Sequence, residues 1–527
     1  MRKGVIVCVA FLLIGLSLTF GENATNNVSA QAGPEMLVPN LRVRTTISDL
    51  VTPISMAFIG NNDFFLLEKN TGQVKRIVNG AVHSTVLDLG VNFASERGLL
   101  GIALHPSFPN NPGVYLYWTC RSTGAPADPF FPDETRCLDA NMFAADTEEI
   151  LQVPLLGNRV DRFVWNGSTL TFDHNLIMLR AFQNDGAPVP PNQGDEEQPA
   201  RGNHDGGVLR FGPDGKLYIL FGDNGRRGQL QNLPCGPTAN CPGPAQPDDQ
   251  FGGPEPDDAH LSGVILRLNP DGTTPTDNPF FSAGASIPGE VGANIQKIFA
   301  YGLRNSFGMD FDPKSGALWE QENGDDSFSE LNRADPGFNS GWVQIMGPPE
   351  RIGQFKAIET SPENDPCLGT PYFGLQQLRW SPELIADTPA QALSRLFVLP
   401  GSHYSEPEFS WKFAVDPGAI GFVRGRALGP QFEGDLFVGG ARPFLEGGHL
   451  FHFNLTGNRR KIGVDDPRLE DRVADNICKY DLTEGESLLI GRNFGTITDL
   501  RTGPNGNMFV VSIDTGSVFE IFSSKKK

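Results

Sequence analysis

The sequence has 527 residues and a net charge of −20, with 62 acidic side chains against 42 lysines and arginines. Because binding to a phosphate backbone needs a basic face, this balance argues against nucleic acid as a partner. Only 20% of the residues are charged, while 61 glycines, 42 prolines and 38 phenylalanines are typical of many short strands joined by tight turns. A chain of this length ordinarily divides into several domains, but radial repetition lets a single all-β propeller grow this large.

The N-terminus has the pattern of a secretory signal peptide. Arg2 and Lys3 precede an apolar run, 5–18, that is short for a transmembrane helix. Cleavage is expected after Gly21, or as late as residue 32. We therefore expect a secreted protein, extracellular or periplasmic, without stable membrane insertion; a membrane anchor is the alternative. The expected segments are a signal peptide at 1–21, a flexible segment at 22–38, one folded domain at 39–524 and a basic tail at 525–527.

Six cysteines follow this segment, and an even number in an exported protein indicates disulfide bonds. We expect the local pairs Cys120–Cys137 and Cys235–Cys241, which leave Cys367 to pair with Cys478, although the sequence alone leaves other connectivities open. There is no Cys-x-x-Cys motif, so a zinc or redox role for these cysteines is not expected. Asn166 and Asn454 stand in glycosylation sequons, whose use depends on the host.

One pattern recurs along the chain: an apolar entry, a turn of Pro, Asp, Asn and Gly residues, then a run of β-formers. Its six copies begin at Met56, Leu104, Phe211, Phe311, Leu428 and Thr502. Asp-Gly or Asn-Gly between apolar runs favours a tight hairpin, because both turn positions favour positive φ. The repeats predict an all-β, six-bladed propeller with long loop insertions at 121–148 and 226–260. The last strand, 517–522, is expected to pair with the strand around Leu41 and close the ring.

The segment Asn-His-Asp-Gly-Gly at 203–207 precedes one of these hairpins. A histidine flanked by glycine is open to approach, and its ordinary pKa near neutrality suits a general base. A loop histidine is also commonly structural, so this motif alone does not assign a catalytic role to His204.

Two further loops carry candidate ligands. In Tyr-Gly-Leu-Arg-Asn at 301–305, Arg304 and Asn305 offer a guanidinium fork and an amide to a carbonyl-bearing ligand. An arginine that ties loop carbonyls together has the same pattern. The acidic segment 322–332 contains Gly324 among oxygen-bearing side chains, which suits Ca²⁺, with a solvated acidic loop as the alternative.

These segments occur in a specific order with two others. The complete set is Glu96-Arg-Gly-Leu-Leu-Gly-Ile-Ala-Leu-His-Pro, His204-Asp-Gly-Gly with the following Phe-Gly-Pro-Asp-Gly-Lys-Leu-Tyr, Gly263-Val-Ile-Leu-Arg-Leu-Asn-Pro-Asp-Gly, Tyr301-Gly-Leu-Arg-Asn, and Glu322-Asn-Gly through Gly341-Trp342. In this order and spacing they resemble the soluble glucose/sorbosone dehydrogenase family, quinoproteins that use pyrroloquinoline quinone (PQQ). The resemblance extends over roughly residues 40–525.

The resemblance implies a six-bladed propeller that oxidises an aldose-type sugar hydroxyl with PQQ and Ca²⁺ and passes electrons to an external acceptor. The site residues that it implies are His204 as general base; Arg304 and Asn305 at the reactive carbonyl of the quinone; Glu96 beside the reactive edge; Arg442 at a cofactor carboxylate; Gly324 and Asp325 as backbone ligands of Ca²⁺; and Trp411 lining the sugar pocket. The bound Ca²⁺ would polarise the cofactor.

The chain departs from the family pattern before the last blade. The family usually carries two arginines there, one residue apart, that pair with cofactor carboxylates; this chain has Thr496 and Thr498. Each lost charge-assisted contact is worth about 1.5–3 kcal/mol. Arg492 or Arg501 could compensate, depending on their direction.

The expected partner of the base also differs. The family commonly places an aspartate before the histidine, whereas this chain has Asn203, and Asp205 could serve instead. Two alternatives therefore stay open: a non-catalytic carbohydrate- or protein-binding propeller that has lost PQQ, and a Ca²⁺-dependent hydrolase such as a lactonase.

Overall fold

Short antiparallel strands make up most of the computed structural model, as the glycine- and proline-rich sequence predicts. The structure describes residues 33–121, 142–143, 153–182, 202–225, 261–342, 344–370, 386–440 and 447–524. Gly33–Lys527 form one compact unit. Within the described ranges no helix is both long and apolar enough to cross a membrane. The expected signal peptide, the cysteines Cys137, Cys235 and Cys241, and Arg442 lie outside the described residues.

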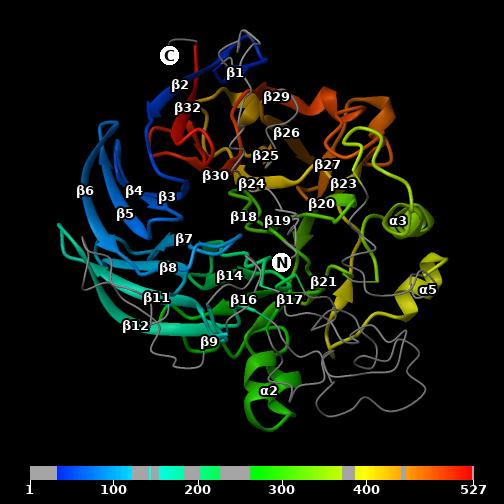
Figure 1. The fold of residues 1–527 in the computed structure, drawn as a ribbon, viewed down its shortest axis with the longest axis horizontal. Helices are drawn as coiled ribbons and strands as arrows, with labels where there is room; N and C mark the ends of the chain where they lie inside the picture. The colour runs from blue at the N-terminus through cyan, green and yellow to red at the C-terminus, as the bar shows by residue number, and fades with distance from the viewer. Residues whose placement is uncertain are drawn as a thin grey trace, which may run out of the picture. The chain divides into compact units, whose positions relative to one another are not determined.

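Most of the described strands form six sheets that follow one another around a common centre, from the blue to the red strands of Figure 1. Blade 1 contains β3 (Pro53–Gly60), β4 (Asp63–Glu68), β5 (Gln73–Val78) and β6 (Ala81–Asp88). Blade 2 contains β7 (Leu99–Leu104), β8 (Gly113–Thr119), β11 (Asn158–Trp165) and β12 (Leu170–Leu179). Blade 3 contains β13 (Leu209–Phe211), β14 (Leu217–Phe221), β16 (Val264–Leu268) and β17 (Ile298–Tyr301), with β21 (Phe338–Asn339) and β22 (His403–Tyr404) added at its edge.

The second half of the ring follows the same plan. Blade 4 contains β18 (Gly308–Phe311), β19 (Leu318–Glu322), β20 (Ser327–Ala334) and β23 (Phe409–Phe413), with β28 (Val473–Ala474) at its edge. Blade 5 contains β24 (Pro417–Phe422), β25 (Leu436–Gly440), β26 (His449–Thr456) and β29 (Leu489–Arg492), with β1 (Glu35–Met36) and β27 (Lys461–Gly463). Blade 6 contains β30 (Ile497–Thr502), β31 (Met508–Ser512), β32 (Ser517–Ser523) and β2 (Leu41–Ile47).

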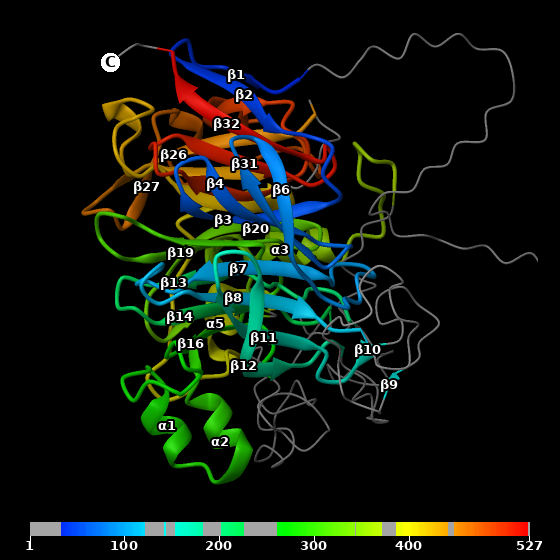
Figure 2. The same ribbon diagram turned by 90° about the vertical axis from the view of Figure 1, so that its left-hand side faces the viewer.

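The remaining elements are short. A two-stranded sheet pairs β9 (Met142–Phe143) with β10 (Val153–Pro154). The helices are α1 (Phe281–Ala285), α2 (Gly289–Ile295), α3 (Ile352–Glu359) and α5 (Pro389–Ser394), with 3₁₀ turns η1 (Pro349–Arg351), η3 (Pro430–Phe432), η4 (Pro467–Leu469) and η5 (Gly485–Leu488). Figures 1 and 2 both place α2 outside blade 3, away from the centre of the ring.

The last blade is completed by a strand from the start of the chain, which confirms the predicted closure. β2 pairs antiparallel with β32, and Leu41 lies opposite Ser523. Figures 1 and 2 both show the two strands side by side. The two ends of the domain thus complete one blade together, which closes the ring.

The hairpins form where Asp-Gly and Asn-Gly predicted them. Gly215, between β13 and β14, has φ +72°, and Gly506, between β30 and β31, has φ +79°. Positive φ costs glycine little because it has no Cβ. These turns confirm the repeat from which six blades were predicted.

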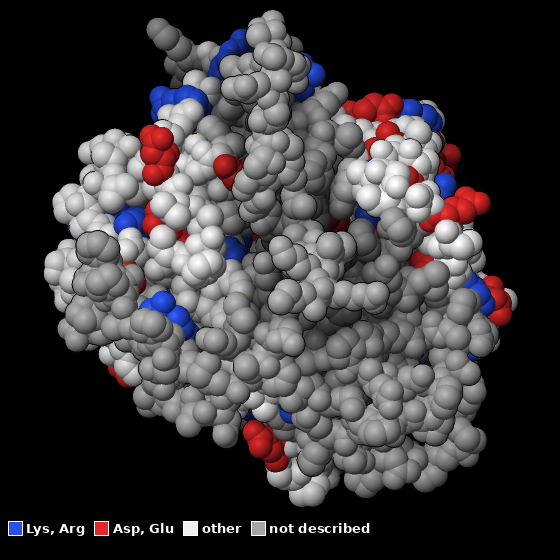
Figure 3. Space-filling model, viewed as in Figure 1, with Lys and Arg blue, Asp and Glu red and all other residues white. Residues whose placement is uncertain are grey.

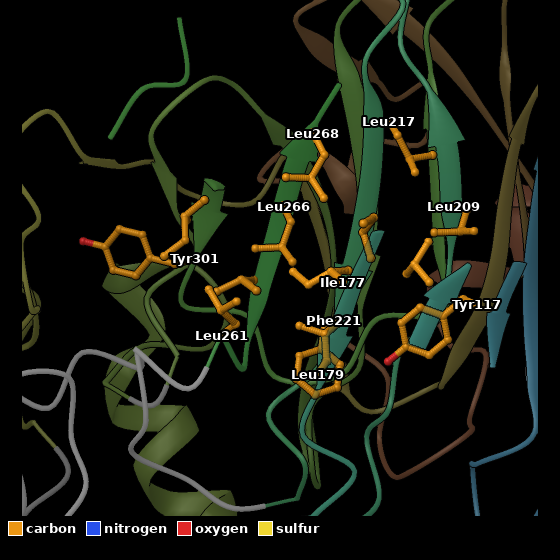
Figure 4. Close-up of a cluster of buried hydrophobic side chains, with 14 of the residues drawn as sticks. Tyr117, Ile177, Leu179, Leu209, Leu217, Phe221, Leu261, Leu266, Leu268 and Tyr301 are labelled. Carbon is orange, nitrogen blue, oxygen red and sulfur yellow. The ribbon is translucent and has the colours of Figure 1, made fainter. Parts of the chain in front are cut away.

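Aliphatic and aromatic side chains fill the space between neighbouring blades. Figure 4 shows one such cluster, to which blade 2 contributes Tyr117 and Ile177 and blade 3 contributes Leu209 and Leu266. Complete burial of a side chain of this size stabilises the fold by about 1.5–3 kcal/mol.

On the face in Figure 3, described lysines and arginines are interspersed with aspartates and glutamates around the rim.

The first strands of neighbouring blades contact one another, which shows that they lie innermost in the ring. These contacts join β3 with β7, β7 with β13, β18 with β24, β24 with β30, and β30 with β3. A cavity of about 290 Å³ lies where these strands end, lined by Arg210, Arg424 and Arg501 among others. His204 and Arg304 instead precede β13 and β18. The candidate site therefore lies at the opposite end of the central strands from this cavity.

Candidate functional site

His204 belongs to a buried hydrogen-bond network at the start of β13. Its backbone is left-handed, with φ 59°, and its side chain is 5% exposed. Nδ1 of His204 lies 2.6 Å from Oδ1 of Asp223, which follows β14. The other carboxylate oxygen of Asp223 accepts a hydrogen bond from Nε1 of Trp342 at 3.0 Å. A carboxylate at Nδ1 favours the tautomer with its proton there, which leaves Nε2 able to accept a proton.

The partner of His204 is Asp223, so the expectation for Asp205 was wrong. The carboxylate of Asp205 instead accepts a hydrogen bond from Nδ2 of Asn158 at 2.8 Å, beneath the site. Burial raises the pKa of Asp205 to about 7, although Arg97 nearby acts in the opposite direction. His204 and Asp205 are neighbours in the chain, but their side chains bind different partners, Asp223 and Asn158.

Glu96 and Arg304 join the same network. Oε2 of Glu96 accepts a hydrogen bond from the backbone N–H of His204 at 2.8 Å. The carbonyl of Arg304 accepts one from the backbone of Asp223 at 2.9 Å, and its guanidinium lies 5.6 Å from the ring centre of Trp342. Three segments that are far apart in the sequence therefore meet around His204.

Arg304 also holds the loop after β19. Its Nη1 donates to the carbonyl of Asn323 at 2.7 Å, and its Nη2 pairs with the carboxylate of Asp325. Arg304 is 4% exposed. The guanidinium is thus fixed in direction by a carbonyl and a carboxylate of the loop, which is the alternative considered for it from the sequence, while its contact with a ligand stays a prediction.

Several amide groups next to this network have no partner among the described residues. They are Oδ1 of Asn305 and both side-chain atoms of Asn224 and Asn323, in residues that are at most 4% exposed. Buried polar groups are nearly always hydrogen-bonded, so such atoms indicate a polar ligand or ordered water. A quinone carbonyl accepts hydrogen bonds, and the side-chain nitrogens of Asn224 and Asn323 are donors of the kind it requires.

One of the two predicted calcium ligands, the backbone carbonyl of Asp325, already has a cation as its partner. The carbonyl of Asp325 accepts a hydrogen bond from Nζ of Lys479 at 2.7 Å. The same ammonium pairs with the carboxylate of Asp326 at 2.9 Å. At Gly324, a Cβ would lie 1.9 Å from the carbonyl oxygen of Ser327, so the tight turn itself requires glycine. A resident cation therefore lies where the resemblance implied Ca²⁺.

Trp411 is a core residue, which corrects the expectation that it lines a sugar pocket. It lies on β23 and is 0% exposed. Its ring packs 5.0 Å from that of Phe409 and 5.4 Å from that of Phe451. The pattern of β23 points its tryptophan into the contact between blades 4 and 5 rather than toward His204.

Among the described residues, the two arginines considered as substitutes for the missing pair bind other partners. Thr496 donates from its backbone to Asp514 at 2.7 Å. Arg492 pairs with Glu35 on β1. Arg501 pairs with an aspartate at 3.0 Å and lines the cavity at the other end of the ring. Neither arginine lies with the residues around His204.

The sequence pattern of the glucose/sorbosone dehydrogenase family matches residues 50–154 and 194–366, together more than half of the chain. The chain belongs to this family. Quinoprotein glucose dehydrogenase B of Acinetobacter calcoaceticus is 24% identical over 98% of this chain and 94% of its own length. An aldose sugar dehydrogenase of Escherichia coli is 26% identical over 59% of this chain and 57% of its own length.

Solved structures show the same fold. The apo-form of the soluble aldose sugar dehydrogenase of Escherichia coli matches with a TM-score of 0.53 at 20% identity, over 91% of this chain and 99% of that chain. The PQQ-bound form of the aldose sugar dehydrogenase of Streptomyces coelicolor matches with a TM-score of 0.50 at 20% identity, over 92% and 98% of the two chains. These matches confirm the six-bladed propeller of the family.

Sequence reasoning missed three residues of this region: Asp223, Trp342 and Lys479. Asp223 stands in Gly-Asp-Asn-Gly directly after a strand, a turn signal that could have been noticed as a candidate. Trp342 only ended a motif. Lys479 had no signal, because it reaches the loop after β19 from a distant part of the chain.

Proposed function

We propose that the protein is a secreted oxidoreductase that oxidises the hydroxyl of an aldose-type sugar with PQQ and passes the electrons to an external acceptor. The buried His204–Asp223 pair, at 2.6 Å, is the observation that carries this proposal. Membership of the glucose/sorbosone dehydrogenase family and the unpaired amides beside the pair support it. The signal-like N-terminus and the disulfide support export.

His204 acts as the general base. With its Nδ1 proton directed at Asp223, Nε2 takes the proton of the sugar hydroxyl, and the carboxylate stabilises the imidazolium that forms. The hydrogen bond from Trp342 holds Asp223 in this direction. PQQ supplies the hydride acceptor when it is bound.

Arg304, Asn224 and Asn305 are the residues that would hold the quinone at its carbonyl edge. Arg304 is already oriented by its own partners, so little side-chain freedom is lost on binding. At the other edge, Thr496 and Thr498 offer no charge to the carboxylates of PQQ. Without two charge-assisted contacts of about 1.5–3 kcal/mol each, we expect weaker binding of PQQ than in relatives that have both arginines.

The experiment is a titration of the purified protein with PQQ, followed by dye reduction with a panel of aldoses. The proposal predicts saturable PQQ binding and sugar-dependent reduction of the dye. His204→Ala should keep PQQ binding and lose at least about 10²-fold in rate. Absence of binding at micromolar PQQ would instead favour the non-catalytic binding propeller, for which the two threonines are the specific argument.

A further inference from the structure

The loop after β19, at 323–326, is neutralised by two cations of the chain itself. Arg304 binds the carbonyl of Asn323 and the carboxylate of Asp325. Lys479 binds the carbonyl of Asp325 at 2.7 Å and the carboxylate of Asp326 at 2.9 Å. The two aspartates of the loop thus face one guanidinium and one ammonium. All four of these charged side chains are at most 6% exposed.

Lys479 is held in this position from both sides. It is 5% exposed, and its backbone N–H donates to Asp365 at 2.9 Å. The preceding residue, Cys478, forms a disulfide with Cys367, which is 111 residues away in the sequence. The same carboxyl group of Asp365 also accepts from the backbone of Cys367 at 2.9 Å. The disulfide and the shared carboxylate together fix the segment that delivers the ammonium.

We propose that Lys479 is the permanent cation of this loop and takes the place of the Ca²⁺ that the family resemblance implies at the carbonyl of Asp325. Ca²⁺ takes six to eight oxygen ligands at about 2.3–2.6 Å. The carbonyl of Asp325 and one carboxylate oxygen each of Asp325 and Asp326 already bind Lys479 or Arg304. A divalent ion there would also meet a buried ammonium at close range, where poor screening makes repulsion strong.

The rest of the described chain offers no better group of protein ligands close by. Among the described histidine, cysteine, aspartate and glutamate side chains, one group is compact enough to share an ion: Asp365 with Cys367 and Cys478. Those two cysteines are joined to each other. The inference rests on the proposed function only in placing the loop beside the cofactor, and cation binding can be measured without PQQ.

Calcium binding is measured first, by equilibrium dialysis at micromolar Ca²⁺ and by melting in Ca²⁺ or in a chelator. We expect the melting temperature of the wild-type protein to be the same in both.

Lys479→Met leaves the carboxylates of Asp325 and Asp326 with only the guanidinium of Arg304. The variant should therefore bind one more Ca²⁺ per chain than wild type, and its melting temperature should be higher in Ca²⁺ than in chelator. Lys461→Met, at an exposed lysine of β27, is the matched control and should behave as wild type. Equal Ca²⁺ binding by wild type and Lys479→Met would overturn the proposal.

PQQ affinity gives a second test that needs no variant. In the wild-type protein, quenching of tryptophan fluorescence by PQQ should give dissociation constants within twofold of each other in Ca²⁺ and in chelator. A tenfold or greater tightening by Ca²⁺ would contradict a resident ammonium. If PQQ does not bind under either condition, the proposed function fails, while the difference in Ca²⁺ binding between wild type and Lys479→Met still decides the role of Lys479.

Discussion

The carboxylate of Asp223 lies 2.6 Å from Nδ1 of His204, at the open end of the β13–β14 hairpin, where His204 precedes β13 and Asp223 follows β14. The residues that hold this pair come from other parts of the chain: Glu96, which precedes blade 2, binds the backbone of His204, and Trp342, which follows β21 at the edge of blade 3, binds Asp223. A base whose tautomer is set in this way is prepared for proton removal before any ligand arrives.

Asp223→Asn tests this preparation. The amide keeps the size of the side chain but not its charge, so His204 loses the carboxylate that stabilises its protonated form. We expect sugar-dependent dye reduction to fall about 10²–10⁴-fold with little change in PQQ affinity. Steady-state kinetics with PQQ in excess, and fluorescence titration for binding, measure the two quantities. An equal loss in binding and in rate would indicate a structural role instead.

Trp411→Ala tests the correction made for this residue. Because the ring is 0% exposed in the contact between blades 4 and 5, its loss should lower the free energy of unfolding by about 3–5 kcal/mol. The KM for the sugar should not change in the fraction that remains folded. Urea denaturation and initial rates at several sugar concentrations measure these effects. A raised KM with unaltered stability would restore the sugar-pocket assignment.

Asp205→Asn should change the dependence of stability on pH. Burial raises the pKa of Asp205 to about 7, whereas an unfolded aspartate titrates near about 3.9. The folded chain therefore binds the extra proton, and this contribution to stability is full below about pH 4 and is lost as pH rises through about 7. The free energy of unfolding of Asp205→Asn, minus that of wild type, should therefore increase by up to about 4 kcal/mol from pH 4 to pH 8. Urea denaturation at both pH values checks the sign.

Asp499 should behave in the opposite way. Burial alone would raise the pKa of this carboxyl group, but Arg501 and Arg210 overcome it and the pKa is lowered. Its contribution to stability is then present above the unfolded pKa and is lost as pH falls through the lower folded value. Asp499→Asn, which leaves the buried Arg210 without its carboxylate, should cost about 3–5 kcal/mol at pH 7 and less in acid. If the loss of unfolding free energy caused by Asp499→Asn does not change with pH, a lowered pKa of Asp499 in the folded chain is excluded.

The disulfide between Cys367 and Cys478, the pair that remained after the two expected local pairs, should stabilise the propeller. Cys367–Cys478 encloses a long segment, with a separation of 111 residues. Replacement of both cysteines by serine should lower the free energy of unfolding by about 2–5 kcal/mol, because the unfolded chain regains freedom. Melting of the double variant beside wild type, with and without a reducing agent, measures this. Reduction should lower the melting temperature of wild type by more than that of the variant, which keeps only the disulfides expected among the other cysteines.

Much of this protein followed from the sequence alone. The spaced Asp-Gly and Asn-Gly turns predicted the blades, since turn chemistry is local and glycine meets it with positive φ. The β-forming run at 517–522 predicted the last strand, and its pairing with β2 is confirmed. The placement of His204 and Arg304 before two innermost strands was also visible, because loops at one end of consecutive blades meet at the same end of the ring.

Only the tertiary structure decided which groups bind one another across the ring. The partner of His204, the burial of Trp411 and the contact of Lys479 with the carbonyl of Asp325 all depend on side-chain direction between distant segments. Neither composition nor spacing contains that information, because a bend of a few residues turns a side chain from one partner to another. The sequence alone placed the site at one end of the ring, and long-range packing determined its base partner and its cation.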